Sequence, residues 1–340
     1  MSSITLPVEL GGPMSVADLA RLHPRAAEWA DDFVLSREMV GAAERARLYR
    51  RAQSGQLVTV RPGVFLPAGR WTGLTADDRY LVRIRAAALT ARSPLVFAGL
   101  SGGALWRLPI IGQWPQRPVV LAERAAGGRS TRTLERRCTA LPAEIWVVDG
   151  LATLGLPEVV VDVARHASFG VAVAMADRAL AKKTAATGGV LGQAVSKSEL
   201  FDALTVLDVV HGGAKALAVI EFADGESGSA GESISRVVIY RLGFAMPLLQ
   251  FEFRDAQGRI VVDFWWPDLR LVGEFDGKGK YVRDEYTGGR STAEVVLAEN
   301  ERENRLRALG PTVVRWGWAE AMSPPILRRK LLAAGVSPSP

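Results

Sequence analysis

The spacing of apolar residues changes along the N-terminal part of the chain and predicts two helices followed by a hairpin. Helical spacing runs through residues 15–35 and 36–55, where Ser36 is a candidate N-cap, Leu48 points inward and Gly55 ends the second helix. Two short strand-like runs, 57–60 and 64–66, then surround the turn 61–63. This order over residues 15–70 is typical of a winged helix-turn-helix domain.

Arginines gather on the second of these helices and at the tip of the hairpin. Residues 41–140 contain 17 arginines, no lysine and five acids, a net charge of +12, whereas the whole chain carries +6. The remaining residues must therefore carry −6. A basic segment joined to an acidic one predicts binding of a polyanion, here double-stranded DNA. The alternative is an arginine-rich surface that is only solvated. The candidate DNA-binding residues are Arg45, Arg47, Arg50 and Arg51 on the helix and Arg61 at the wing tip.

The middle of the chain mixes helical and strand patterns and predicts a second domain over residues 79–185. Residues 77–92 have helical spacing, 117–123 and 144–150 read as strands, and 156–183 as a pair of helices. A stretch rich in Gly, Ala, Ser and Thr follows at 184–199, as in a linker, then a helix and a further break at 223–233. We therefore assign 186–225 to a linker and helix, and 226–335 to a third domain.

Three segments of the first two domains together resemble the AbiE-type abortive-infection antitoxins. They are "LVTVRPGVFLPAG", "VFAGLSGGALWRL" and "VVDGLATLGLPEVVVDVARHASFGVAVAMADRAL", and their order and spacing carry the likeness over roughly residues 30–185. The resemblance implies a winged helix that binds promoter DNA and a following domain linked to antitoxin function. It also implies a nucleotidyltransferase-type toxin as a partner.

The C-terminal pattern predicts the order α-β-β-β-α-β and brings three carboxylates together. A turn at 267–270 places Asp263 opposite Glu274, and Asp276 shares their face because side chains alternate along a strand. Opposed like charges destabilise a sheet, so this arrangement needs a compensating cation. Mg²⁺ or Mn²⁺ suits such oxygen ligands and would support phosphodiester hydrolysis. The alternative is a solvated face whose acids deter edge-to-edge aggregation.

Residues 226–318 resemble the PD-(D/E)XK, or restriction-endonuclease-like, superfamily, and most of all its very-short-patch-repair-like branch. By this resemblance Asp263 and Glu274 are the paired metal-binding acids, and Glu232 is the acid on the first helix. Asp276 stands where the superfamily has lysine. Lys280 or Arg302 could replace that lysine, although Arg302 could equally anchor its helix to the sheet. The resemblance also covers the helix pattern Glu299, Arg302 and Leu306.

Two functions follow from these expectations. In the first, the chain is an antitoxin-type DNA-binding regulator with a non-catalytic nuclease-like domain; in the second, it is an Mg²⁺-dependent endonuclease targeted by its winged helix. The expected fold class is α/β in a multidomain (α+β) arrangement. The single cysteine excludes an intrachain disulfide, and neither a signal peptide nor an apolar run of about 18 residues is present, so we expect a cytoplasmic protein without membrane contact.

Overall fold

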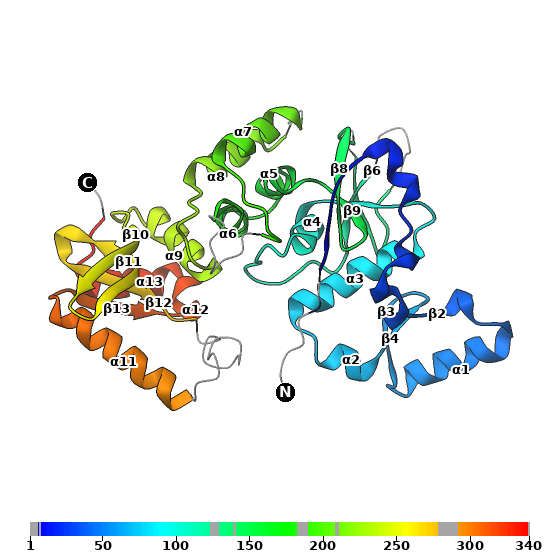
Figure 1. Cartoon of the computed structure of the whole chain (residues 1–340), viewed down its shortest axis with the longest axis horizontal. Helices are drawn as coiled ribbons and strands as arrows, with labels where there is room; N and C mark the ends of the chain where they lie inside the picture. Colours follow the sequence, from blue (N-terminus) through cyan, green and yellow to red (C-terminus); the bar gives the residue numbers. More distant parts are fainter. Residues whose placement is uncertain are drawn as a thin grey trace. The chain divides into compact units, whose positions relative to one another are not determined.

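The computed structural model describes residues 6, 8–122, 129–138, 141–181, 190–207, 211–277 and 292–338, without the side chains of 292, 293, 295 and 296 (Figure 1). Helices and several sheets occur together, which agrees with the expected mixed α/β class. The chain forms two compact units. Unit 1 contains Met1–Ala167 with Lys183–Glu221, and unit 2 contains Ser168–Lys182 with Phe222–Pro340. None of the described helices is both long enough and apolar enough to cross a membrane.

The first predicted helix, over residues 15–35, is wrong. Unit 1 begins with strand β1 (Leu10–Ser15), three short 3₁₀ helices (Val16–Arg21, Pro24–Ala26 and Glu28–Asp32) and strand β2 (Val34–Leu35). Pro24 explains the break, because proline has no N–H to donate and disfavours helical backbone at the preceding His23. Helical spacing of apolar residues was therefore a poor guide where a proline interrupts it.

The second predicted helix and the hairpin are present, with a later helix start. Helix α1 (Gly41–Gln53) begins after Val40, whose N–H donates to the Glu44 carboxylate at 2.8 Å, so Ser36 is not its N-cap. Gly55, with φ of +77°, ends the helix as predicted. Strands β3 (Leu57–Arg61) and β4 (Val64–Pro67) form the hairpin, and β2 pairs with β4 to give the order β2-β4-β3. Leu48 of α1 is buried against this sheet, as its spacing predicts.

The rest of unit 1 is built on a six-stranded sheet in the order β1-β8-β9-β5-β6-β7. A buried ion pair between Arg85 and Asp149, at 2.7 Å, joins helix α3 to the turn after β8. The elements are α2 (Ala68–Thr72), α3 (Ala76–Thr90), β5 (Val96–Phe97), α4 (Gly99–Leu105), β6 (Val119–Ala122), β7 (Glu135–Cys138), β8 (Glu144–Val148), β9 (Leu151–Thr153), α5 (Leu156–His166), α7 (Lys197–Val206) and α8 (Gly213–Phe222).

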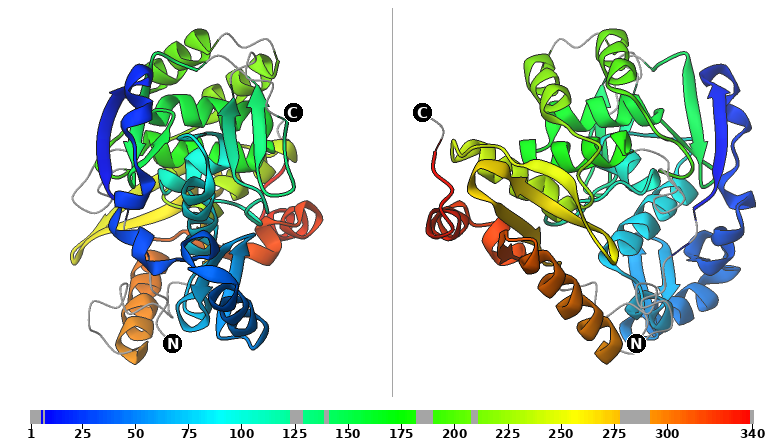
Figure 2. Two further views of the ribbon diagram at one scale, coloured as in Figure 1. Left: turned by 90° about the vertical axis from the view of Figure 1, so that its right-hand side faces the viewer. Right: turned by 60° about the vertical axis from the view of Figure 1, so that its left-hand side comes forward.

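Unit 2 contains the predicted α-β-β-β-α-β order and a four-stranded sheet in the order β10-β11-β12-β13, with β13 parallel to β12. Helices α9, α12 and α13 pack on one face of this sheet, and α11 covers the other (Figure 2). The elements are α6 (Phe169–Leu180), α9 (Ala230–Arg241), β10 (Leu248–Asp255), β11 (Gly258–Trp266), β12 (Leu271–Phe275), α11 (Thr292–Ala308), β13 (Thr312–Trp316), α12 (Trp318–Ala321) and α13 (Pro324–Ala333).

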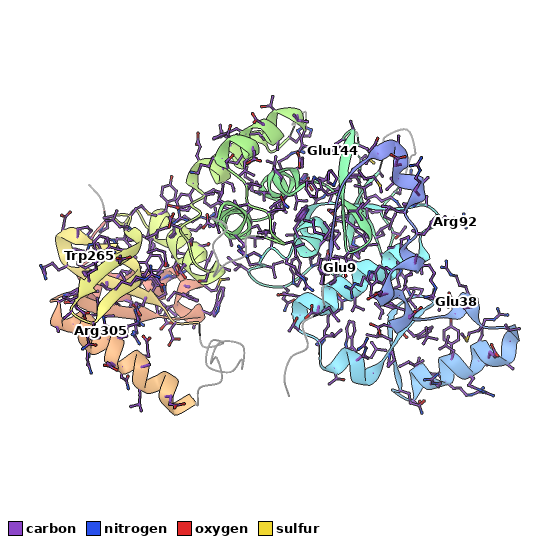
Figure 3. All side chains as sticks on the ribbon, in the orientation of Figure 1. Glu9, Glu38, Arg92, Glu144, Trp265 and Arg305 are labelled. Carbon is purple, nitrogen blue, oxygen red and sulfur yellow. The ribbon has the colours of Figure 1, made fainter. Side chains whose placement is uncertain are left out.

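The predicted register of the β11–β12 hairpin is confirmed, but the expected alternation of side chains is not kept along the whole of β11. Phe264 pairs with Gly273, and this register continues from Trp266 and Leu271 at the turn. Strict alternation would put Val262 on the same face as Phe264, but Val262 packs with Trp265 in the core under α11. Trp265 is labelled in Figure 3. The alternation is interrupted next to Asp263, and across the sheet Gln250 has a left-handed backbone with φ of +46°. Local backbone geometry of this kind is not visible in a hydrophobic pattern.

Arg305 secures the far end of α11 to the same sheet. It forms two hydrogen bonds to the Asp255 carboxylate, at 2.7 and 2.8 Å. These bonds lower the pKa of Asp255 to about 2. The helix is thus held at the β10–β11 turn.

The small-residue stretch at 223–233 is a packed loop that leads into α9. Ser227 is buried and its hydroxyl lies 3.1 Å from that of Ser233. A Cβ on Gly225 would lie 2.5 Å from the Leu180 carbonyl oxygen, so glycine is required for this close approach. Residues 184–189 of the other predicted linker, 184–199, lie outside the described residues, and its last three residues already belong to α7. Composition alone therefore overstated the break at 223–233.

Candidate functional site

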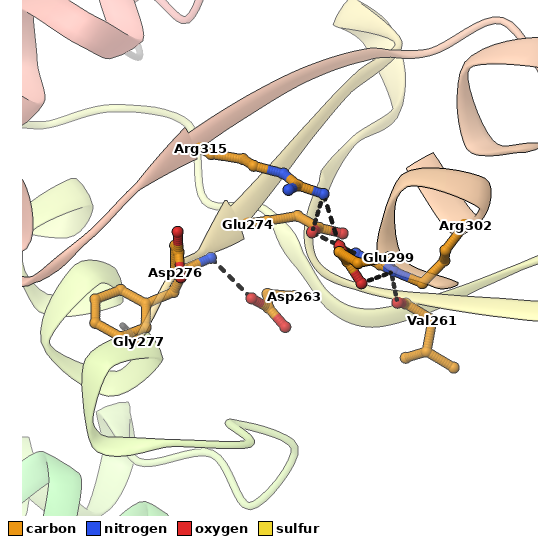
Figure 4. Close-up of a pocket in the computed structure, with 9 residues that line it drawn as sticks. Val261, Asp263, Glu274, Asp276, Gly277, Glu299, Arg302 and Arg315 are labelled. Atoms are coloured by element: carbon orange, nitrogen blue, oxygen red, sulfur yellow. Dashed lines mark hydrogen bonds and ion pairs between the residues drawn. The ribbon is translucent and has the colours of Figure 1, made fainter. Parts of the chain in front are cut away.

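A pocket of about 240 Å³ in unit 2 brings together three of the predicted acids (Figure 4). Asp263 comes from β11, Glu274 from β12, and Asp276 follows the end of β12. The side of the pocket under α11 carries Arg302, with Arg315 from the adjacent β13. The complete lining is Val261, Asp263, Glu274, Phe275, Asp276, Gly277, Glu299, Arg302 and Arg315. The sheet register therefore places the acids together, as the sequence predicts.

Arginine side chains supply positive charge directly at Glu274. Its Oε2 accepts a hydrogen bond from Arg302 at 2.5 Å and lies 3.3 Å from Arg315 (Figure 4). The other oxygen, Oε1, is buried and has no hydrogen-bond partner among the described residues. An unsatisfied buried acceptor of this kind costs about 1–3 kcal/mol unless a ligand or water completes it. One oxygen of Glu274 is thus paired with arginine, and the other has no donor among the described residues.

Arg302 anchors α11 to the sheet, which is one of its two predicted roles. Its guanidinium donates to Glu274, to Glu299 at 2.9 and 3.0 Å, and to the Val261 carbonyl at 3.2 Å. These contacts join α11 to β11 and β12 across the mouth of the pocket. The guanidinium head is therefore held by several acceptors and is not directed freely into the pocket.

Sequence reasoning missed Arg315 and its ion pairs with α11. Arg315 lies opposite Glu274 in the parallel β12–β13 pair and contacts Glu299 at 2.8 Å and Glu303 at 3.1 Å. The available signal was the alternation of side chains along a strand: Arg315 is the polar position next to buried Trp316 in a short apolar strand. Finding it also required knowing that β13 lies beside β12.

Asp263 and Asp276 are positioned mainly by backbone. The Asp263 carboxylate accepts a hydrogen bond from the Phe275 N–H at 2.8 Å, which ties β11 to β12 beyond their last paired residues. The Asp276 N–H donates to the Trp316 carbonyl at 2.7 Å, so the chain stays beside β13 after β12 ends. Both carboxylates consequently face the same pocket as Glu274.

Two predicted residues do not belong to this described pocket. Glu232 is buried at the start of α9, where its carboxylate accepts hydrogen bonds from the Gly228 N–H, the Ser229 hydroxyl and Gln250, at 2.8–3.0 Å. It is not among the pocket lining. Lys280 lies outside the described residues. Within the part of the chain that is described, no group of three or more His, Cys, Asp or Glu residues is arranged to hold a metal ion.

Burial and charge act differently on the two members of the central ion pair. Burial raises the pKa of the Glu274 carboxyl, and the Arg302 charge opposes this while the Asp263 charge adds to it. Burial alone would lower the pKa of Arg302, but hydrogen bonds to Glu299 and the charge of Glu274 outweigh it and raise the pKa. Arg302 has two carboxylate partners, whereas Glu274 leaves one oxygen unpaired. Of these two residues, Glu274 is therefore the one whose charge is less fully compensated.

The raised pKa of Glu274 predicts a pH dependence of stability. The folded state keeps the proton of Glu274 to a higher pH than the unfolded chain, so its contribution to stability is present below the ordinary carboxyl pKa and is lost as pH rises through the folded value. Glu274→Gln removes this titration. Denaturation of both proteins between pH 4 and pH 8 should show the stability difference moving in favour of the glutamine variant as pH rises. A difference independent of pH would contradict the assignment.

The predicted DNA-binding arginines lie on unit 1, and all four on α1 are exposed: Arg45, Arg47, Arg50 and Arg51. None of the four forms an ion pair with another described residue. Arg61, at the hairpin, is partly buried, and its guanidinium donates to the Thr133 hydroxyl at 3.1 Å. Burial lowers the pKa of Arg61. Its described contact is therefore within unit 1.

Comparison with known proteins finds limited similarity. No protein-family profile matches the chain. Two curated relatives from Mycobacterium tuberculosis are each 32% identical to it over 120 residues: uncharacterized protein MT2308 of strain CDC 1551 / Oshkosh and uncharacterized protein Rv2248 of strain ATCC 25618 / H37Rv. The matched stretch covers 35% of this chain and 41% of each relative, so the chain spans less than half the length of either.

Proposed function

We propose that this chain is a DNA-binding regulator of the antitoxin type, acting in the cytoplasm, with a nuclease-like C-terminal domain that does not cleave. The observation that carries the proposal is the set of exposed arginines on α1 beside the β3–β4 hairpin. With about 100° of rotation per residue, Arg47, Arg50 and Arg51 fall within an arc of about 100°. A helix that presents three guanidinium groups on one side can follow a phosphate backbone.

The ion pairs of unit 2 favour a non-catalytic role for its acidic pocket. A metal-dependent nuclease needs its carboxylates available to the ion, whereas one oxygen of Glu274 is held by Arg302 and Arg315. Asp276 also stands where a lysine would steady the attacking water in the superfamily that residues 226–318 resemble. The proposed partner, a nucleotidyltransferase-type toxin, rests on the resemblance of residues 30–185 to AbiE-type antitoxins. The proposal as a whole is tested by incubating the protein with duplex DNA and Mg²⁺: the DNA should be bound and should stay uncut.

The second candidate function is an Mg²⁺- or Mn²⁺-dependent endonuclease targeted by the same helix. The unpaired Oε1 of Glu274 favours it, since Glu274 lines a pocket together with Asp263 and Asp276. Carboxylate oxygens are the donors that Mg²⁺ prefers, so the chemistry of these residues fits. When bound, such an ion would polarise a phosphoryl oxygen and lower the pKa of water. The residues' own part would be to hold and orient the ion.

Metal-dependent stability separates the two candidates. If the acids bind a divalent ion in the folded state alone, Mg²⁺ or Mn²⁺ at a hundredfold excess over its Kd should stabilise the protein by about 2.7 kcal/mol. Asp263→Asn should abolish this response while its amide oxygen still accepts the Phe275 N–H. Asp268→Asn, at an exposed turn position, is the matched control and should respond like the wild type. Thermal unfolding with and without metal provides the measurement.

A cleavage assay completes that comparison. Duplex DNA cut in Mg²⁺ or Mn²⁺ by the wild type but not by Glu274→Ala would establish the endonuclease and contradict the non-catalytic role. Intact DNA, together with equal melting of the wild type and Asp263→Asn in millimolar metal, would eliminate the metal site.

A further inference from the structure

A second pocket, of about 330 Å³, adjoins the acidic pocket in unit 2. It shares Asp276 and Arg315 with that pocket. Its remaining lining comes from the end of β13, from α12 and from Lys330 of α13. The complete set is Asp276, Arg315, Trp316, Gly317, Trp318, Ala319, Glu320 and Lys330. None of this lining except Asp276 and Arg315 enters the functions considered above.

The side chain of Trp318 in this pocket is packed against a neighbouring ring and is also accessible to solvent. The Trp318 ring packs edge-to-face against Phe275, with centroids 5.2 Å apart and an interplanar angle of 85°. Trp318, the first residue of α12, is nevertheless 42% exposed, whereas Trp265, Trp266 and Trp316 of the neighbouring sheet are buried. A ring already restrained by a neighbour loses little conformational freedom when a planar ligand stacks on it. Trp318 therefore has the properties of a stacking platform.

Cationic donors lie beside that platform. Arg315 uses Nη2 for its carboxylate partners, but its Nε is buried without a hydrogen-bond partner among the described residues. The Lys330 ammonium donates to one Glu320 oxygen at 3.1 Å, and the other oxygen accepts the Gly317 N–H at 3.0 Å. Glu320 thus fixes Lys330 at the rim. Arg315 and Lys330 line the same pocket, and an unsatisfied guanidinium N–H and an ammonium are both suited to the oxygens of a phosphate.

We propose that this second pocket binds an unpaired nucleotide of a DNA single strand. The proposal rests on the wall that it shares with the acidic pocket, on the exposed indole of Trp318 and on the unpaired Nε of Arg315. The base stacks on Trp318, and a neighbouring phosphate accepts hydrogen bonds from Arg315 and Lys330. A paired base within a duplex does not expose its face, so the site requires a single-stranded segment. This contact goes beyond duplex binding by α1 and does not depend on it.

Anisotropy of a labelled twelve-residue oligothymidylate tests the site in the full chain. The parent protein for the series carries Arg50→Ala and Arg51→Ala, so that α1 contributes little to the signal. Stacking on an aromatic ring is worth about 1–3 kcal/mol per base, so Trp318→Ala should weaken binding by about 5- to 150-fold. Trp318→Phe should retain most of the affinity. Met322→Ala, an equally exposed apolar position just after α12, should leave binding unchanged.

A second variant tests the phosphate contact, and measurements with duplex DNA distinguish single-strand binding at this pocket from duplex binding by α1. Lys330→Met should reduce the salt dependence of single-strand binding by about 0.7 in the log–log slope. Equal affinity of Trp318→Ala and the parent, or equal losses in Trp318→Ala and Met322→Ala, would overturn the proposed site. Duplex binding by the chain with α1 intact should be unaffected by Trp318→Ala. Failure of α1 to bind duplex DNA would therefore leave the single-strand result interpretable.

Discussion

Replacing Arg302 with methionine should lower the free energy of unfolding of unit 2 by about 2–3 kcal/mol. Methionine preserves much of the packing of the arginine stem but removes the donor that neutralises Glu274, which is buried and has a second oxygen without a described partner. Loss of one member of a buried ion pair typically costs about 3–5 kcal/mol. The remaining contact from Arg315 reduces that figure. Chemical denaturation of the full chain, followed by circular dichroism, measures the change.

The matched control is Arg307→Met on the same helix. Arg307 pairs with Glu303 one turn away and its side chain is 61% exposed, so its loss should cost less than about 1 kcal/mol. A double variant, Glu274→Gln with Arg302→Met, should recover part of the stability because no charge is left unpaired at Glu274. Equal effects of the Arg302 and Arg307 changes would show that the ion pairs of Arg302 with Glu274 and Glu299 do not stabilise unit 2.

Replacing Arg50 and Arg51 with alanine should weaken duplex DNA binding by about tenfold near 0.1–0.2 M salt. Both side chains are exposed on α1 and have no described ion-pair partner, so they are available to phosphates. Each lost phosphate contact reduces the slope of log affinity against log salt by about 0.9, which gives a total reduction of about one to two. Binding isotherms at several salt concentrations provide both quantities.

The control must remove the same charge elsewhere. Arg254→Ala with Arg259→Ala changes the net charge by the same two units on β10 and β11, where the side chains are 79% and 75% exposed. This pair should affect duplex binding little. If both double variants lose the same affinity, overall charge would explain the effect. Undiminished binding of the Arg50 and Arg51 variant at low salt would exclude α1 as the DNA-binding helix.

Much of unit 2 could be predicted from local pattern. Its strands are bounded by turn residues and lie in apolar runs, and the predicted hairpin register was confirmed from the turn at 267–270. Unit 1 was less predictable at its start, because Pro24 interrupts a segment that has helical spacing and the residues just before that segment form β1, which pairs with the distant β8. The helix start at Gly41 shows the same limit. Candidate caps are common in sequence, and tertiary contacts select among them.

The sequence by itself determined the order of elements in unit 2, the hairpin register that brings Asp263, Glu274 and Asp276 together, and the exposure of the α1 arginines. These features depend on spacing within one segment or across one turn. Only the tertiary structure decided which cation lies at Glu274. Arg302 reaches it from a helix 28 residues later, and Arg315 from a parallel strand. Parallel pairing has no short turn that relates the two strands, so no local spacing could have placed Arg315 beside Glu274.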